Sequence, residues 1–137
     1  MAITHQSITL SPKSRGFHII TSEVLAHIKG LPVEGIFHLY CQHTSCGLTI
    51  NENADPDVLH DFELYFNKIV PETMKGMKHT IEGPDDMPAH IKAALVGSSI
   101  SVPISNGRLQ LGTWQGIYLC EFRNHPRSRT VIATIYS

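Results

Sequence analysis

The sequence lacks the features that mark disulfide-rich, exported and membrane proteins. Its 137 residues contain no CxxC pair, and the three cysteines leave an odd count. A disulfide scaffold is therefore not expected, and a reducing cytoplasm suits the chain better. No apolar run approaches the ~20 residues that a membrane-spanning helix requires, and residues 1–5 show no basic stretch leading into an apolar one. We expect a soluble, cytoplasmic protein with no membrane partner.

An excess of either charge is also missing. Eleven basic residues face 12 acidic ones, for a net charge of −1, so no basic surface for a nucleic-acid partner is predicted. Charged residues make up 17% of the chain, below the usual share of about 25%, which suggests that a subunit contact covers part of the surface. The length suits a single domain with a sizeable core, and we assign residues 1–137 to it.

Alternating apolar residues and turn signals predict an α+β fold. Expected strands cover residues 2–10, 17–20, 33–42, 47–50, 99–104, 108–111, 113–122 and 130–136. Residues 2–10 alternate with a half-polar pattern that is typical of an edge strand, and Asn106-Gly107 is a strong hairpin turn signal. Most strands follow one another directly, which favours antiparallel sheets, with two main helices and one short one.

Three helices are expected between these strands. The short one covers residues 23–29, with Thr21 or Ser22 as its cap. The clearest start is Asp55, an N-cap candidate before Pro56, and Pro71 ends that helix. Its expected apolar face contains Val58, Phe62, Tyr65, Phe66 and Ile69. A polar loop at residues 72–86 leads to the third helix, at residues 89–96.

Nine histidines are present, and three of them lie near acidic or hydroxyl residues. His43 ends an expected strand and is followed by Thr44 and Ser45, whose hydroxyl and N–H groups suit an anion. His79 and His90 bracket a run of acidic residues at the start of the third helix. Imidazoles near carboxylates are typical of divalent-metal sites and of acid–base catalysis, although a hydrogen-bonded turn histidine is an equal alternative for His43.

Two carboxylates are the best catalytic candidates. Glu52 lies before the Asp55 cap and has no capping role of its own. Asp85 and Asp86 together exceed what one helix cap needs, so Asp86 is free to orient a metal-bound imidazole. His60 has neighbouring aspartates on the helix and is expected to be a solvated or ion-paired surface residue.

Other chemistry-bearing residues leave alternatives open. Trp114 and Gln115 lie between glycines, where they suit a planar ring, or Trp114 is a core residue. Arginines 123, 127 and 129 near the last turn either hold a phosphate or form an exposed basic turn. Cys41 and Cys120 are expected to be small buried hydrophobes, and Cys46 has no basic partner fixed by the sequence.

Three runs of sequence resemble the YjbQ family, often labelled secondary thiamine-phosphate synthase. They are HTSCGLTINENADPDVLHD, HTIEGPDDMPAHIKAALVGSS and PISNGRLQLGTWQGIYLCEFR. The resemblance covers about residues 7–135, and the GRL…GTWQ stretch is its signature. It implies an antiparallel β-sandwich or barrel-like core and a homotrimer with clefts between subunits. The family pattern is intact at His43, Glu52, His79, Asp86 and His90.

The implied activity is the coupling of hydroxymethylpyrimidine diphosphate to a thiazole phosphate, with release of pyrophosphate. His43, His79 and His90 would hold a divalent metal, and imidazole ligands favour zinc or another transition metal over magnesium. Thr44 and Ser45 would assist the leaving group, and Trp114 and Gln115 would hold the pyrimidine. Two alternatives share the site: a non-catalytic metabolite-binding trimer and a metal-dependent hydrolase of a phosphorylated small molecule.

Overall fold

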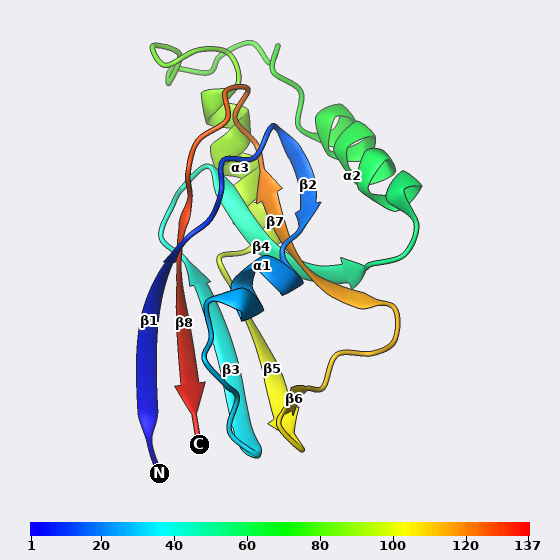
Figure 1. Ribbon diagram of the computed structural model, residues 1–137. Helices are drawn as coiled ribbons and strands as arrows, with labels where there is room; N and C mark the ends of the chain where they lie inside the picture. Colours follow the sequence, from blue (N-terminus) through cyan, green and yellow to red (C-terminus); the bar gives the residue numbers. More distant parts are fainter.

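The computed structural model describes residues 1–137, which form two antiparallel sheets and three helices (Figure 1). The five-stranded sheet has the order β1 (Ile3–Thr9), β8 (Thr130–Tyr136), β3 (Glu34–Cys41), β5 (Ser99–Ser105) and β6 (Arg108–Leu109). The three-stranded sheet has the order β2 (Gly16–Ile19), β7 (Gln115–Glu121) and β4 (Cys46–Glu52). The helices are α1 (Thr21–Ala26), α2 (Pro56–Ile69) and α3 (Asp86–Val96). None of them is long and apolar enough to cross a membrane.

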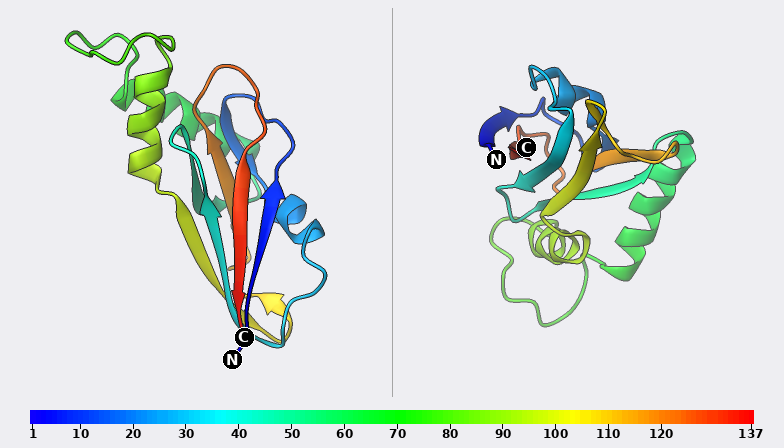
Figure 2. Two further views of the ribbon diagram at one scale, coloured as in Figure 1. Left: turned by 90° about the vertical axis from the view of Figure 1, so that its left-hand side faces the viewer. Right: turned by 90° about the horizontal axis from the view of Figure 1, so that it is seen from below.

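The small sheet lies between the large sheet and the two longer helices, and its central strand β7 is buried on both faces. Ile117 and Leu119 pack into the core cluster shared with the large sheet and α1. Tyr118 and Cys120 point the other way, into a cluster that residues of α2 and α3 cover. This period of two follows from strand geometry. The expected α+β sandwich is confirmed, whereas the sheets do not close into a barrel (Figure 2).

Two turn and edge predictions are confirmed. Asn106 and Gly107 have φ of 52° and 72°, and they connect β5 to β6, which pair antiparallel. Positive φ at both central residues is the geometry that favours Asn-Gly in tight hairpins. Strand β1 forms an edge of the large sheet and pairs only with β8. Its half-polar pattern is therefore the pattern of a strand with one side toward solvent.

Helix α2 begins as expected, but its apolar face was predicted too wide. The Asp55 carboxylate accepts a hydrogen bond from Asp57 N at 2.9 Å. Phe62 and Phe66 pack on the aromatic cluster around Phe17. By contrast, two residues of the expected face are largely exposed: Tyr65 is 66% exposed and Ile69 is 52% exposed. The helix lies beside β2 at the margin of the small sheet, so only a narrow stripe is covered (Figure 1).

The other two helices begin earlier than predicted. Helix α1 starts at Thr21, whose hydroxyl accepts a hydrogen bond from Ile117 N instead of capping the helix. Helix α3 starts at Asp86 rather than at residue 89, and Gly97 ends it with a φ of 104°. The earlier start of α3 matters for the site, because it places Asp86 and His90 one helical turn apart on the same face.

Candidate metal centre and the adjoining cleft

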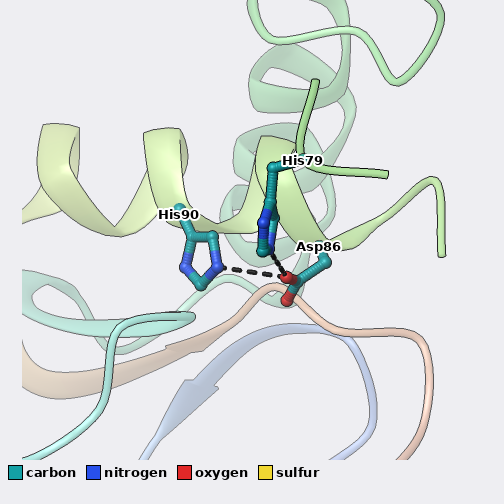
Figure 3. A group of neighbouring side chains, drawn as sticks. All are labelled: His79, Asp86 and His90. Carbon is teal, nitrogen blue, oxygen red and sulfur yellow. Dashed lines mark hydrogen bonds and ion pairs between the residues drawn. The ribbon is translucent and has the colours of Figure 1, made fainter. Parts of the chain in front are cut away.

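His79, Asp86 and His90 converge on one point at the start of α3 (Figure 3). The Asp86 Oδ2 atom lies 2.6 Å from His79 Nε2 and 3.1 Å from His90 Nε2. One ligand atom from each residue lies within 4.8 Å of the other two. His79 comes from the loop that precedes the helix, whereas Asp86 and His90 are four residues apart on α3. The sequence predicted both histidines as ligands and Asp86 as their neighbour.

The Asp86 carboxylate is held in place from behind. Its side chain is almost fully buried, and its Oδ1 atom lies 2.7 Å from Arg123 Nη1. Arg123 Nε donates to Asp85 Oδ2 at 2.8 Å, so one guanidinium holds both aspartates. Burial alone would raise the pKa of Asp86, but the His79 hydrogen bond and the His90 and Arg123 charges keep it below its usual value. Asp86 therefore stays anionic and aims one oxygen at the two imidazoles.

The His90 ring has a fixed orientation. Its Nδ1 atom lies 2.8 Å from the carbonyl oxygen of Thr44. A carbonyl only accepts hydrogen bonds, so Nδ1 carries a hydrogen, and in the neutral ring the lone pair lies on Nε2. In that neutral form the lone pair faces the anionic Asp86 Oδ2 atom at 3.1 Å, whereas in the charged form Nε2 donates a hydrogen bond to it. Two electron-rich atoms at this distance need a cation between them, either a proton or a metal ion.

The donor set fits a transition metal. Two imidazole nitrogens and one carboxylate oxygen are the ligand types of zinc and non-haem iron sites, whereas magnesium prefers oxygen ligands alone. Histidine ligands in metal sites commonly donate their second N–H to a backbone carbonyl, as His90 does toward Thr44. Asp86 receives the matching support from Arg123. The residues present thus fit a divalent transition metal.

His43, expected as the third ligand, is not part of this group. Its Nε2 atom accepts a hydrogen bond from Thr130 N at 2.8 Å, so that nitrogen is already occupied. Burial and the positive charge of Arg129 lower the pKa of His43, which keeps the ring neutral. His43 instead lies on the wall of a cavity of about 610 Å³ that also contains His90 and Cys46.

A second, wholly polar cleft of about 310 Å³ adjoins the His79–Asp86–His90 group. It is lined by Gln42, His43, Thr44, Ser45, Glu82, Asp86, His90, Arg123, Arg127 and Arg129. Thr44 presents an exposed side chain here. The Ser45 hydroxyl instead accepts a hydrogen bond from Arg129 Nη2 at 3.0 Å. Of the three arginines, Arg123 and Arg129 bind carboxylates, whereas Arg127 has only a long contact to a backbone carbonyl.

The remaining predicted site residues lie at the other end of the small sheet. Glu52 is the last residue of β4 and pairs with Gln115, the first residue of β7. Cys46, next to the cleft, begins β4, and six residues of extended strand correspond to about 20 Å. Trp114 adjoins this far end and is 65% exposed, which excludes the core alternative. Within one chain, Glu52, Trp114 and Gln115 therefore line neither of the two pockets that contain His43 and His90.

Glu121 supports the site and was not named by sequence reasoning, whereas Arg123, expected to hold a phosphate or to lie in an exposed turn, is instead buried against the two aspartates. Arg123 binds both aspartates, and the fully buried Glu121 accepts hydrogen bonds from Arg129 Nε and Nη2, each at 2.6 Å. One signal was available for Arg123, because the second aspartate at the start of α3 had no capping role. No signal marked Glu121, which sits in an apolar strand and meets Arg129 only in the folded chain.

Together, the fold and the site define an α+β two-sheet protein with a His–Asp–His group beside a polar cleft. The family described as "UPF0047 protein YjbQ-like" matches residues 6–137. The UPF0047 protein YjbQ of Salmonella typhimurium is 52% identical, and that of Escherichia coli O157:H7 is 49% identical, each over 132 residues and 95% of both chains. The chain therefore belongs to the YjbQ-like UPF0047 family.

Solved structures agree with this assignment. A YjbQ/UPF0047 family protein from Clostridium acetobutylicum superimposes with a TM-score of 0.81 at 39% identity, covering 96% of this chain and 99% of that one. A conserved hypothetical protein from Thermus thermophilus also has a TM-score of 0.81, at 34% identity, covering 93% and 97%. A YbjQ-like protein of unknown function from Sulfolobus solfataricus, at 23% identity and a TM-score of 0.83, shares the fold.

Proposed function

We propose that this protein is a metal-dependent enzyme that acts on a small phosphorylated molecule. The observation that carries the proposal is the fixed position of His90, whose Nε2 atom lies 3.1 Å from Asp86 Oδ2 while its Nδ1 atom contacts the Thr44 carbonyl. His79 completes a three-residue donor set around the same point. We assign His79, Asp86 and His90 as the ligands of zinc or a similar transition metal. His43 is a neutral residue that lines the adjoining cleft.

The protein's own residues prepare the cleft for a phosphate. Arg127 faces the cleft without a carboxylate partner, and Thr44 offers an exposed hydroxyl. These are the charge-assisted and neutral donors that phosphate oxygens accept. Arg123 and the two buried aspartates hold the His–Asp–His group rigid, so little reorganisation is needed when charge develops. A bound divalent ion would stabilise negative charge on a phosphoryl oxygen or a leaving group.

The reaction that the family resemblance implies is the coupling of hydroxymethylpyrimidine diphosphate to a thiazole phosphate. Pyrophosphate leaves in that reaction, and the cleft beside the metal ligands suits it. Trp114 and Gln115, which would hold the pyrimidine, and the catalytic candidate Glu52 lie about 20 Å along the sheet from this cleft. The coupling reaction therefore requires a second chain, and in the homotrimer that the resemblance implies, the exposed Trp114 of one chain would reach the cleft of the next.

Hydrolysis of a phosphorylated small molecule is the second candidate. The distance of about 20 Å between Trp114 and the cleft favours it, because hydrolysis does not need Trp114. The His–Asp–His group and the polar cleft belong to one chain and need no ring-binding platform. A phosphate ester or anhydride is then the substrate, held by Arg127 and Thr44 beside Asp86. This candidate predicts activity that survives Trp114→Ala, whereas the coupling reaction predicts its loss.

The test of metal dependence is elemental analysis of protein purified without chelator, followed by zinc titration of the chelator-treated protein. We expect about one equivalent of metal per chain, and at least a tenfold loss of affinity in His90→Ala and Asp86→Asn. His60→Ala, on the exposed surface of α2, is the matched control. Near-zero metal content and equally weak zinc binding in all four proteins would contradict the proposed metal centre.

A separate assay tests catalysis. Pyrophosphate release from the two thiamine precursors and phosphate release from simple phosphate esters are followed for the wild type, Asp86→Asn and Trp114→Ala. An enzyme loses turnover in Asp86→Asn, whether or not substrate affinity also falls. If metal and phosphate compounds bind and no assay detects turnover, the non-catalytic metabolite-binding alternative replaces the enzyme.

A further inference from the structure

We propose that Cys41 and Cys46 form a reversible, peroxide-sensitive dithiol whose oxidation moves the loop beside the metal-binding group. The two Sγ atoms lie 3.2 Å apart, and both residues are 1% exposed. Cys41 ends β3 in the large sheet, and Cys46 begins β4 in the small sheet. The pair therefore spans the point where the chain crosses between the sheets, and only residues 42–45 separate the two cysteines.

The surroundings of the pair favour a thiolate. The hydrogen bond from Cys46 lowers the pKa of the Cys41 thiol, burial opposes this, and the Arg129 guanidinium contributes further lowering. The same hydrogen bond and burial raise the pKa of Cys46, because the two sulfurs share one proton. Cys120 offers a contrast within the chain, since it is fully buried, is separate from the pair and has a pKa raised by burial.

A small oxidant has a route to the pair. Cys46 lies on the wall of the 610 Å³ cavity that also contains His43, Thr44 and His90. Hydrogen peroxide is much smaller than this cavity and can occupy it beside Cys46. Cys120 is not among the residues that line it, and packs with Phe17 and Tyr118 on the other face of the small sheet. The cavity therefore borders the pair and not the third cysteine, so we expect the pair to be oxidised first.

The chemistry balances with peroxide as the oxidant. The thiolate of the pair attacks one oxygen of hydrogen peroxide, becomes a sulfenic acid and releases hydroxide. The second thiol loses its proton to that hydroxide and attacks the sulfenic sulfur, which expels a second hydroxide; this hydroxide takes up the proton that the first thiol released when it became a thiolate. Overall, two thiols and one peroxide give one disulfide and two waters. A small dithiol reductant reverses the change by thiol–disulfide exchange.

Bond formation has a consequence for the site. The sulfur atoms must approach from 3.2 Å to about 2.05 Å, which tightens the connection formed by residues 42–45. That connection carries the Thr44 carbonyl that receives the His90 Nδ1–H hydrogen bond, and the Ser45 hydroxyl that Arg129 contacts. Oxidation is therefore expected to disturb the orientation of His90.

Thiol mapping of the full chain tests the proposal. Wild-type protein is treated with hydrogen peroxide, denatured and alkylated at or below neutral pH to prevent disulfide exchange, and digested for mass spectrometry. We expect a Cys41–Cys46 disulfide with the mass of two hydrogens lost, an alkylated Cys120, and full recovery of three thiols after dithiothreitol. Cys120→Ala is expected to form the same disulfide, and Cys46→Ala none. Circular dichroism checks that both variants fold.

Three free thiols after peroxide, a disulfide that involves Cys120, or a disulfide between two chains would overturn the proposal.

The effect of the disulfide on His90 is measured separately, in an experiment that does not need a metal. Imidazole NMR signals of His90 are expected to shift on oxidation, while those of the exposed His60 stay in place. Unchanged His90 signals in a protein with the mapped disulfide would overturn the coupling.

Discussion

Arg123 Nη1 lies 2.7 Å from Asp86 Oδ1, on the side of the carboxylate opposite to the two histidines. The same guanidinium binds Asp85 and the carbonyl oxygen of Glu82. One buried arginine thus connects the start of α3 with the loop that leads to it. This arrangement sets the direction of the Asp86 oxygen that faces the two histidines, and it leads to the first prediction.

Arg123→Met is expected to weaken zinc binding by about 10–100-fold, the usual cost of losing a group that supports a metal ligand. Asp86 keeps its ligand oxygen but loses the contact that aims it. Isothermal titration of chelator-treated protein measures the effect, and a thermal melt confirms that the variant is folded. Arg127→Met, which changes the same cleft without touching a carboxylate, should bind zinc normally. Equal zinc affinity in all three proteins would contradict this role of Arg123.

The separation of Glu52 from the histidines gives a second prediction. Glu52→Gln should leave zinc affinity within about twofold of the wild type, because the carboxylate lies about 20 Å along β4 from the cleft. Asp86→Asn, measured in parallel, should lose at least tenfold. The comparison uses the same titration for both variants. A loss of zinc binding in Glu52→Gln would place Glu52 at the metal, through a contact between subunits.

The buried Glu121–Arg129 ion pair is expected to be costly to break. Glu121→Gln leaves the Arg129 charge unpaired inside the protein, and such changes destabilise by about 3–5 kcal/mol. Urea unfolding followed by circular dichroism measures the free energy of unfolding. Replacing both partners, in Glu121→Leu with Arg129→Met, should recover part of the loss because no charge remains unpaired. A double variant less stable than Glu121→Gln would point to a different cause.

Gly47 allows β4 to lie against the end of α3. A Cβ atom at this position would be 2.7 Å from the carbonyl oxygen of Gly97, which also accepts the hydrogen bond from Leu48 N. Gly47→Ala is expected to destabilise by about 1–3 kcal/mol, the usual cost of overpacking. Gly30→Ala is the control, since nothing lies within 4 Å of its added Cβ. The two variants should have clearly different urea midpoints, and equal midpoints would refute the steric argument.

A pH dependence is expected from the Lys13–Glu23 ion pair. Burial tends to raise the pKa of Glu23, but hydrogen bonds from Lys13 and from Ser11 N outweigh it and hold the pKa below its usual value. A carboxylate with a lowered folded-state pKa stabilises above its unfolded value, about 4.3. The stabilisation is lost as the pH falls through the folded-state pKa.

Glu23→Gln should therefore be less stable than the wild type at pH 7, by about 1 kcal/mol, the size typical of a partly exposed pair. The difference in unfolding free energy should shrink as the pH falls below about 4. Urea titrations at several pH values measure both proteins. A difference that stays constant down to about pH 3 would mean that the effect of Glu23 is not electrostatic.

Local signals predicted much of the secondary structure. Asp55 caps α2, Asn106-Gly107 forms the hairpin turn, and α3 ends at Val96, each as expected from the local sequence. Boundaries failed where a distant partner competed with a local role. Thr21, an expected helix cap, instead accepts a hydrogen bond from Ile117 N, which lies far away in the chain.

The sequence by itself determined the list of candidate residues, which includes His79, His90 and Asp86 near one helix start. The tertiary structure decided which of the candidates meet. His43 accepts a hydrogen bond from Thr130 N and does not join the group. Trp114 is exposed at the far end of the small sheet, and Arg123 contacts Asp86 on the side away from the histidines. The physical reason is that a helix fixes neighbours four residues apart, whereas contacts between strands depend on a register that no local pattern specifies.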